Sequence, residues 1–147
     1  MEERFKLFTL LITDLFKGIK RLRTEEMSKI GLKSIHLSCL YYIYREGPIS
    51  SKELCEVCRE DKGNISRSLK ALLERGYVKE LDAVRGKYVL TESGTSITEL
   101  LESKINSVLK MAGEGLNDEQ REIMYSGLTI ISNNLAKICD NYTEIEI

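Results

Sequence analysis

Hydrophobic residues recur every three or four positions toward both ends of the chain, which is the spacing of one face of an α-helix. The first predicted helix covers residues 3–23, and its hydrophobic stripe consists of Phe5, Phe8, Ile12, Leu15, Ile19 and Leu22. The C-terminal part predicts two further long helices, over residues 91–112 and 117–140, separated by glycines, and Asn117 and Gln120 have the spacing of a capping box at the start of the second. Because the first helix would be about 30 Å long, which is long for a domain of this size, we expect part of it to pack on a second subunit.

The middle of the chain predicts shorter elements with clear boundaries. A helix over residues 34–46, with Ser34 as its cap, ends at a Gly47–Pro48 break. Ser50 and Glu53 then have the spacing of a capping box, in which each side chain accepts a hydrogen bond from the other residue's backbone amide. The capping box predicts a short helix over residues 51–58.

Residues 61–77 predict a helix with two different faces. Asp61 can cap its first turn, and Gly76 can adopt the left-handed conformation that ends a helix. One face carries the hydrophobic residues Ile65, Leu69, Leu72 and Leu73, and the other carries Gly63, Arg67, Lys70 and Glu74, with Asn64 and Ser66 on its flanks. Arg and Asn are side chains that read guanine and adenine edges in the DNA major groove. An ordinary amphipathic surface helix is the alternative interpretation.

After Gly76 the hydrophobic period changes from that of a helix to that of a strand. Residues 77–81 and 87–90 predict two short strands joined by a turn over residues 82–86. Two helices joined by a tight turn form a helix-turn-helix, and a hairpin directly after them is a wing. This order of elements favours DNA binding over a plain surface helix.

Composition and charge are consistent with a globular protein that has one basic region. The 147 residues are 42% hydrophobic and 31% charged, and the length predicts one domain, residues 1–147. Net charge is −1, yet residues 59–87 hold eight Lys or Arg against five Asp or Glu, a local excess of +3. Such a local excess fits focused contact with phosphates. The sequence has no apolar run of membrane-spanning length and no basic, cleavable leader, so we expect a cytoplasmic protein without a membrane partner.

Several short motifs occur in the order seen in one family. The chain contains LYYIYREGPIS (40–50), with a Gly-Pro break after an aliphatic-rich helix, then Glu53-Leu54, and then DKGNISR (61–67), which fits D-K-x-x-x-S/T-R. It continues with LLERGYV (72–78), which fits L-x-x-x-G-Y-V, and with LTESG (90–94), which fits L-T-E-x-G. In these motifs the chain resembles the MarR family of winged helix-turn-helix transcriptional regulators. The motifs cover roughly residues 32–94, and the terminal helices match only by pattern.

The resemblance implies a mainly α fold with a small β-hairpin wing. Residues 32–91 would form the winged-helix DNA-binding lobe, and residues 1–31 and 92–147 would form helices that interleave in a homodimer. Two recognition helices would then lie roughly 34 Å apart and read a pseudo-palindromic operator on double-stranded DNA. The family pattern further implies a repressor that a small-molecule effector releases.

The predicted DNA contacts lie on the recognition helix and on the wing: Lys62, Asn64, Ser66, Arg67, Lys70, Arg85 and Lys87. The wing departs from the family pattern, in which an Asp braces an Arg that enters the minor groove. The hairpin here is shorter and offers only Asp82 and Arg85. Arg85 is therefore either the minor-groove contact, with Lys87 on a phosphate, or a solvated turn residue.

Two further clusters suggest regulation. Tyr41 and Tyr44 are candidates to line an effector pocket, with ordinary core or surface tyrosines as the alternative. His36 with Cys39, and Cys55 with Cys58, are each three positions apart and on helices expected to pack together. Four such N and S ligands could bind zinc or, as thiols, sense oxidants. The alternative is that these cysteines are structural and that no cofactor is bound.

The sequence leaves two other functional classes besides a DNA-binding regulator. A winged-helix module that binds another protein, without specific DNA binding, is the main alternative. An enzyme is disfavoured, because the single His has no evident nucleophile with a third orienting group and the sequence has no glycine-rich phosphate loop.

Overall fold

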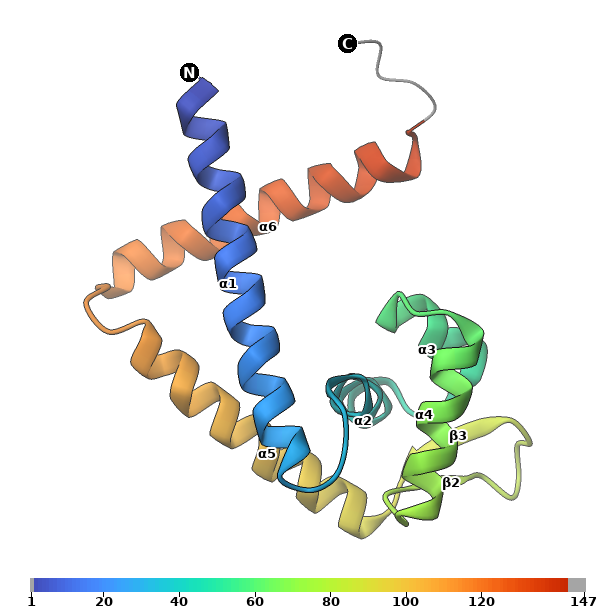
Figure 1. Cartoon of the computed structure of the whole chain (residues 1–147). Coiled ribbons are helices and arrows are strands. Elements are labelled where there is room, and N and C mark those ends of the chain that lie inside the picture. The colour runs from blue at the N-terminus through green and yellow to red at the C-terminus, as the bar shows by residue number, and fades with distance from the viewer. Residues whose placement is uncertain (1, 143–147) are drawn as a thin grey trace. The chain divides into compact units, whose positions relative to one another are not determined.

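The structure is a computed structural model that describes residues 2–142, with residue 2 described only in its backbone. The described residues form six helices and three short strands (Figure 1): α1 (Glu2–Ser28), α2 (Ser34–Glu46), β1 (Ile49–Ser50), α3 (Ser51–Cys58), α4 (Lys62–Glu74), β2 (Val78–Glu80), β3 (Lys87–Leu90), α5 (Glu92–Ala112) and α6 (Asp118–Asp140). The predicted fold class, mainly α with a small β wing, is confirmed.

The chain forms two compact units, Met1–Ser107 and Val108–Ile147, with the boundary inside α5. The predicted winged-helix lobe, residues 32–91, lies wholly within the first unit. The predicted dimerisation segment 92–147 crosses the boundary, and its end, from residue 143 on, lies outside the described residues.

The wing is a three-stranded antiparallel sheet with the order β1-β3-β2. In β1, Ile49 pairs with Tyr88 and Ser50 pairs with Lys87, and β2 pairs with β3 from Val78–Leu90 to Glu80–Tyr88. The sequence predicted the hairpin of β2 and β3 but not β1. A two-residue strand has no period of its own, so it exists only because β3 is there to pair with it.

The core of the winged-helix lobe lies where α2, α3, α4 and the sheet meet. α1 and α5 each add one buried residue to this core. The buried hydrophobic residues are Met27, Leu32, Leu37, Cys39, Leu40, Ile43, Ile49, Leu54, Ile65, Leu69, Leu72, Val78 and Leu101. Helix α1 ends at Ser28, five residues after its predicted end at residue 23. Met27 lies in this additional turn, and its side chain is buried in the core. Beyond it, Arg75 donates hydrogen bonds to the carbonyl oxygens of Ile30 (2.9 Å) and Gly31 (3.2 Å), tying the α1–α2 turn to the end of α4.

The helix caps agree with the sequence except at α2. Ser50 and Glu53 form the predicted capping box, the Asp61 carboxylate accepts from the Asn64 backbone N–H at 2.7 Å, and Asn117 and Gln120 cap α6. Ser34 was predicted to cap α2, but Lys33 is the N-cap residue. Its backbone N–H donates to Nδ1 of His36 at 2.9 Å, so the imidazole accepts from the N-cap amide as the Glu53 carboxylate does at the start of α3.

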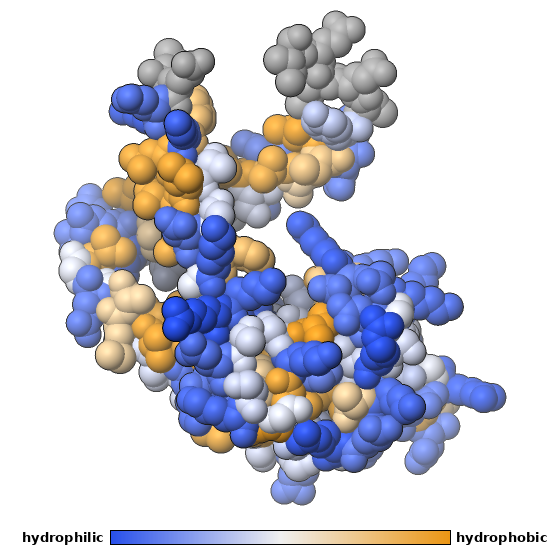
Figure 2. Space-filling view, in the orientation of Figure 1, coloured by the Kyte–Doolittle hydropathy of each residue, from blue (hydrophilic) through white to orange (hydrophobic). Residues whose placement is uncertain are grey.

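Hydrophobic side chains reach the surface along α1 and α6. All residues of the predicted α1 stripe are at least partly exposed, with Phe5 70% and Leu15 59% exposed, and α6 has no buried residue. Figure 2 shows these hydrophobic residues in orange on the surface of α1. Among the described residues, no helix is long and apolar enough to cross a membrane.

Candidate nucleic-acid interface

Helix α4 is seated on the core by the face that the sequence predicted, with one exchange. Ile65, Leu69 and Leu72 are buried as expected, but Leu73 is 39% exposed. Ser68 is buried in its place, and its hydroxyl donates to the carbonyl oxygen of Asn64 at 2.8 Å. The helix is therefore rotated slightly from the predicted orientation, because a serine that bonds its own backbone can be buried at little cost.

The opposite face of α4 presents the predicted cations to solvent. Lys62, Ser66, Arg67 and Lys70 are all exposed. Within the described part of the chain, neither an ion pair nor a hydrogen bond holds the Lys62, Arg67 or Lys70 side chain. An Arg and two Lys left unpaired on a helix that is fixed by its other face can meet phosphates and base edges without breaking internal bonds.

Asn64 is arranged differently from the other predicted contacts. It is half-buried, and its side-chain Nδ2 donates to Oε2 of Glu60 at 2.8 Å. Glu60 lies in the turn between α3 and α4, so this bond joins the turn to the first part of α4. The Asn64 amide would have to leave Glu60, or use its remaining oxygen, to read a base.

On the wing, the two predicted contacts have different surroundings. Arg85 is exposed in the loop 81–86, which is closed by a hydrogen bond from the Gly86 N–H to the Glu80 carboxylate at 2.6 Å. Lys87 instead donates to both carboxylate oxygens of Glu53, at 2.8 and 3.0 Å. This ion pair, together with the backbone N–H of Ser50, lowers the pKa of Glu53 to about 2. Lys87 therefore fastens the wing to the start of α3, and a phosphate would have to compete with Glu53 for it.

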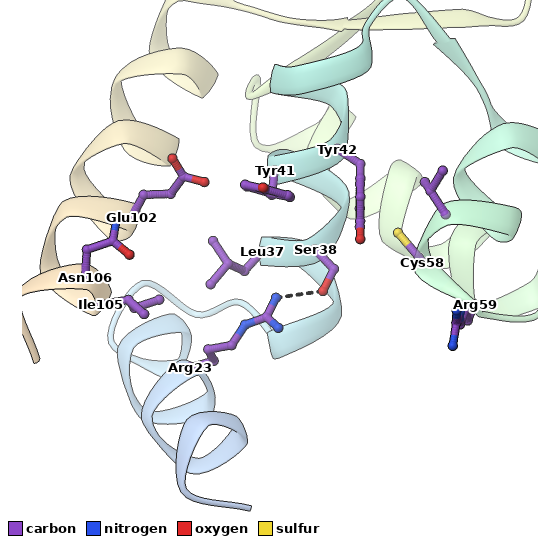
Figure 3. A pocket seen from close by; sticks show the side chains of 11 residues that line it. Arg23, Leu37, Ser38, Tyr41, Tyr42, Cys58, Arg59, Glu102, Ile105 and Asn106 are labelled. Atoms are coloured by element: carbon purple, nitrogen blue, oxygen red, sulfur yellow. Dashed lines mark hydrogen bonds between the residues drawn. The ribbon is translucent and has the colours of Figure 1, made fainter. Parts of the chain in front are cut away.

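A pocket of about 590 Å³ lies beside the helix-turn-helix, between α2, the end of α3 and α5 (Figure 3). Its lining combines hydrophobic and aromatic residues with two arginines: Arg23, Leu37, Ser38, Tyr41, Tyr42, Val57, Cys58, Arg59, Glu102, Ile105 and Asn106. Arg23 donates to the Ser38 hydroxyl at 2.7 Å. The rings of Tyr41 and Tyr42 meet edge to face, with centroids 5.2 Å apart.

Of the two tyrosines predicted to line a pocket, only Tyr41 does so. Tyr44 is exposed, and its hydroxyl donates to the Glu99 carboxylate at 3.0 Å. Tyr42 takes the place of Tyr44 in the lining. The sequence could not distinguish these neighbours, because the rotation of α2 decides which tyrosine faces α3 and which faces solvent.

The four predicted metal ligands do not form one site. Among the described residues, no group of three or more His, Cys, Asp or Glu side chains could hold a metal ion. His36 is used at the start of α2, where burial and the nearby Lys33 and Arg75 lower its pKa. Cys39 and Cys58 belong to the same core cluster, where the neighbouring thiol raises the pKa of Cys39 and lowers that of Cys58, and Cys55 lies one turn before Cys58. The described residues thus do not gather the four predicted ligands around one point, and Cys39, Cys55 and Cys58 lie close to the α2–α3 contact while His36 lies at the start of α2.

Sequence reasoning missed the residues that connect elements. Arg23, Arg59 and Asn106 line the pocket, and Glu60 holds Asn64, although none of them stood out in the sequence. Glu60 lies four residues before Asn64, which is a usable spacing signal for a helical pair, but it precedes the start of α4. The pocket arginines come from separate elements and carry no local signal.

Comparison with known proteins agrees with the interpretation of the middle of the chain as a winged helix-turn-helix. A family model described as MarR family matches residues 30–87, which contain the helix-turn-helix and most of the wing. No curated protein matches the chain.

Solved structures share the fold over most of the chain. A MarR family protein from Bacillus stearothermophilus has a TM-score of 0.82 and 17% identity, and the match covers 92% of this chain and 98% of that one. A MarR transcriptional regulator from Methanosarcina mazei has a TM-score of 0.75 and 24% identity, and the match covers 90% of this chain and 92% of that one. A Mycobacterium tuberculosis MarR family protein in complex with p-aminosalicylic acid has a TM-score of 0.69 and 17% identity, and the match covers 84% of this chain and 97% of that one. The winged helix-turn-helix, its motifs and the family model agree over residues 30–87, and in this region the chain is similar to the MarR family.

Proposed function

We propose that this protein is a repressor that binds a pseudo-palindromic operator as a homodimer and is released by a small ligand. The observation that carries the proposal is α4, which is seated on the core by Ile65, Leu69 and Leu72 and presents Lys62, Arg67 and Lys70 unpaired to solvent. In this arrangement Arg67 reads a base edge and Lys62 contacts a phosphate. Residues 32–91 bind the DNA, with Arg85 of the wing nearest the minor groove.

The dimer is supported by the apolar surface that the single chain leaves uncovered. Along α1, residues such as Phe5, Leu15 and Phe16 are 59–70% exposed, and on α6 Ile123 and Leu135 are 65% and 56% exposed. Each of these two helices exposes apolar side chains along its length, and exposed apolar surface of this kind is typical of an interface. A second copy covers it, with residues 1–31 and 92–147 as the dimerisation segments. A two-fold axis then gives the two recognition helices the symmetry of a palindrome.

The effector is supported by the pocket beside the turn between α3 and α4. Its arginines, Arg23 and Arg59, favour an anion, and its tyrosines with Leu37 and Ile105 favour an aromatic ring. The similar Mycobacterium tuberculosis protein was solved with p-aminosalicylic acid, which is an aromatic carboxylate. We infer that the pocket takes an aromatic carboxylate, whose binding moves Arg59 and the turn that leads into α4.

Arg67→Ala tests the recognition helix. We expect it to weaken binding to a selected operator by about 1–3 kcal/mol and to relax the preference at one base pair of each half-site, because a bidentate base contact is lost. Fluorescence anisotropy against the operator and its single-base variants measures both effects.

Lys62→Ala is the matched control, since it removes one cation from the same face. It is expected to weaken all sequences alike and to lower the salt dependence of binding, as the loss of a phosphate contact does. If Arg67→Ala left both affinity and base preference unchanged in a folded protein, α4 would not be the recognition helix.

Arg23→Gln tests the effector pocket, with benzoate as the probe. We expect benzoate binding, measured by calorimetry, to weaken about tenfold or more, because a charged hydrogen bond of about 1.5–3 kcal/mol is lost. Arg21→Gln, on the exposed side of the same helix, should bind benzoate like the unaltered protein. Equal affinities for both variants would show that benzoate binds elsewhere.

A further inference from the structure

The carboxylate of Glu60 holds the Asn64 side chain in one orientation. Nδ2 of Asn64 donates to Oε2 of Glu60 at 2.8 Å, and both side chains are half-buried. Because a carboxylate only accepts hydrogen bonds, the Asn64 amide turns its NH₂ group toward Glu60 and its oxygen, Oδ1, away from it. Among the residues that the structure describes, none donates a hydrogen bond to Oδ1. Asn64 therefore presents an acceptor that is ready for another partner.

Backbone bonds fix both members of this Glu60–Asn64 pair. The Glu60 N–H donates to the Cys55 carbonyl oxygen at 3.1 Å, which ties Glu60 to the end of α3. The Asn64 N–H donates to the Asp61 carboxylate at 2.7 Å, and the Asn64 carbonyl oxygen accepts from the Ser68 hydroxyl at 2.8 Å. The fold therefore sets the direction of Oδ1 before any partner is bound.

The pair lies at the part of α4 that would enter the major groove. Asn64 is the third residue of α4, and in helix-turn-helix proteins the first residues of the recognition helix contact base edges. Arg67 lies three residues further on, so it is a neighbour of Asn64 on the helix surface. A base next to the one that Arg67 contacts would therefore face the Glu60–Asn64 pair.

The chemistry of the pair matches some bases and not others. Oδ1 of Asn64 is an acceptor, and within the described part of the chain the Glu60 carboxylate beside it forms no ion pair. In the major groove adenine and cytosine present an exocyclic amino group, whereas guanine presents only acceptors, and thymine an acceptor and a methyl group. An acceptor next to a negative charge attracts the amino group of adenine or cytosine and repels the oxygens of guanine and thymine.

We propose that Glu60 is a positioning residue for base recognition, which turns Oδ1 of Asn64 to the DNA so that Asn64 selects adenine or cytosine at one position of each half-site. An Asn whose amide is not held reads adenine alone, by accepting from N6 and donating to N7. Here Nδ2 is bonded to a carboxylate, and hydrogen bonds to charged acceptors are roughly twice as strong as neutral ones. The carboxylate also repels a second acceptor at the same amide group, so adenine N7 is left unused. This inference rests on the proposed function, because it concerns how operator bases are read.

Binding-site selection with the full-length protein and with Asn64→Ala locates the base pair in question. We expect one position that accepts adenine or cytosine with the unaltered protein and any base with Asn64→Ala. An operator with 7-deazaadenine at that position, which lacks N7 and keeps the amino group, should bind the unaltered protein within about twofold of the adenine operator, since no hydrogen bond is lost.

Glu60→Ala releases the Asn64 amide. We expect this variant to prefer adenine over cytosine, because Nδ2 can then donate to N7. It should also bind the 7-deazaadenine operator at least about threefold more weakly than the adenine operator, because one hydrogen bond is then lost. A Glu60 that only stabilised the fold would change the free energy of unfolding and leave the order of base preference as it is.

Glu56→Ala is the matched control. It removes an exposed carboxylate of α3 that, within the described residues, has no side-chain bond to α4. Less repulsion of phosphates should raise the affinity of both variants for all DNA, but Glu56→Ala should keep the base preference of the unaltered protein. In nuclear magnetic resonance spectra of the free proteins, the Asn64 side-chain amide signal should move in Glu60→Ala and stay in place in Glu56→Ala.

Three results would overturn the inference while the proposed function stands. They are a base preference that Asn64→Ala leaves unchanged, a 7-deazaadenine operator that the unaltered protein binds more than about threefold more weakly, and a Glu60→Ala protein that still accepts cytosine equally. If Glu60→Ala does not fold, the first two results still decide. If the unaltered protein selected no sequence at all, the proposed function would fail and this inference with it.

Discussion

Leu15→Glu is expected to separate the dimer into monomers and to reduce operator binding at least a hundredfold. Leu15 is 59% exposed in the single chain and lies in the middle of the α1 stripe that we propose a second copy covers. The substitution would place a carboxylate without a partner in an apolar interface, on both sides of the two-fold axis. Uncompensated charges of this kind cost about 3–5 kcal/mol when buried. A monomer would also lose the gain of about 10²–10⁴ in avidity that comes from holding both half-sites together.

Sedimentation measures the oligomeric state, and anisotropy measures the operator affinity. Thr13→Glu is the matched control, because it adds the same charge to the opposite side of the same exposed helix. It should remain dimeric and bind DNA normally. A Leu15→Glu protein that stayed dimeric, or an unaltered protein that was monomeric, would contradict the assigned interface.

Gly94→Ala is expected to destabilise the first compact unit by about 3 kcal/mol, the upper end of what over-packing usually costs. Gly94 lies in the first turn of α5, directly against the backbone of Tyr77, which follows the end of α4. A Cβ added there would be 1.9 Å from the carbonyl oxygen of Tyr77, which is backbone and cannot swing aside. The same carbonyl already accepts from the Thr91 N–H at 3.0 Å, so α5 would have to move away from β2.

Urea unfolding followed by circular dichroism measures this effect. Gly127→Ala in α6 is the control, since an added Cβ there meets nothing within 4 Å. That variant should be unchanged or up to about 1 kcal/mol more stable, as expected when alanine replaces glycine inside a helix. Equal stability of the two variants would mean that α5 does not pack on Tyr77 as described.

The LTESG motif (90–94) was identified by its resemblance to a family pattern, and the structure shows which contacts its residues make. Thr91 accepts from the Gly94 N–H at 3.1 Å, and its hydroxyl donates to the Gly76 carbonyl at 2.6 Å, where Ser93 also donates. The motif therefore fastens the start of α5 to the glycine that ends α4, which has φ of +71°. Motif resemblance identified these positions, but periodicity alone would have read them only as a helix start.

Local signals predicted most of the lobe, because caps and hydrophobic stripes act within a few residues. Asp61, Ser50 and Asn117 cap the helices that the sequence assigned to them. The failures involve partners that are distant in the chain. β1 depends on β3, and Lys87 is taken by Glu53. The cysteine spacing suggested that His36 joins the cluster, but the orientation of α2 places Cys39 in the same core cluster as Cys58 and leaves His36 at the helix start.

The candidate DNA contacts, too, were predicted only as far as the pattern within one helix decides them. A helical wheel placed Arg67 and Lys70 on the outer face correctly, because that face follows from the buried one. It could not show that Glu60 engages Asn64 or that Tyr42 rather than Tyr44 lines the pocket. These features depend on side-chain contacts and helix rotation.

Selection of binding sites from random double-stranded DNA by the reduced, full-length protein tests the central claim most directly. We expect an enriched inverted repeat whose half-site centres lie about one helical turn apart, roughly 10 base pairs, bound by two chains. Affinity for it should fall steeply as salt rises while remaining far above that for scrambled DNA. If no sequence were enriched, and salt erased all binding alike, the protein would not be a sequence-specific regulator and the winged helix would serve a protein partner instead.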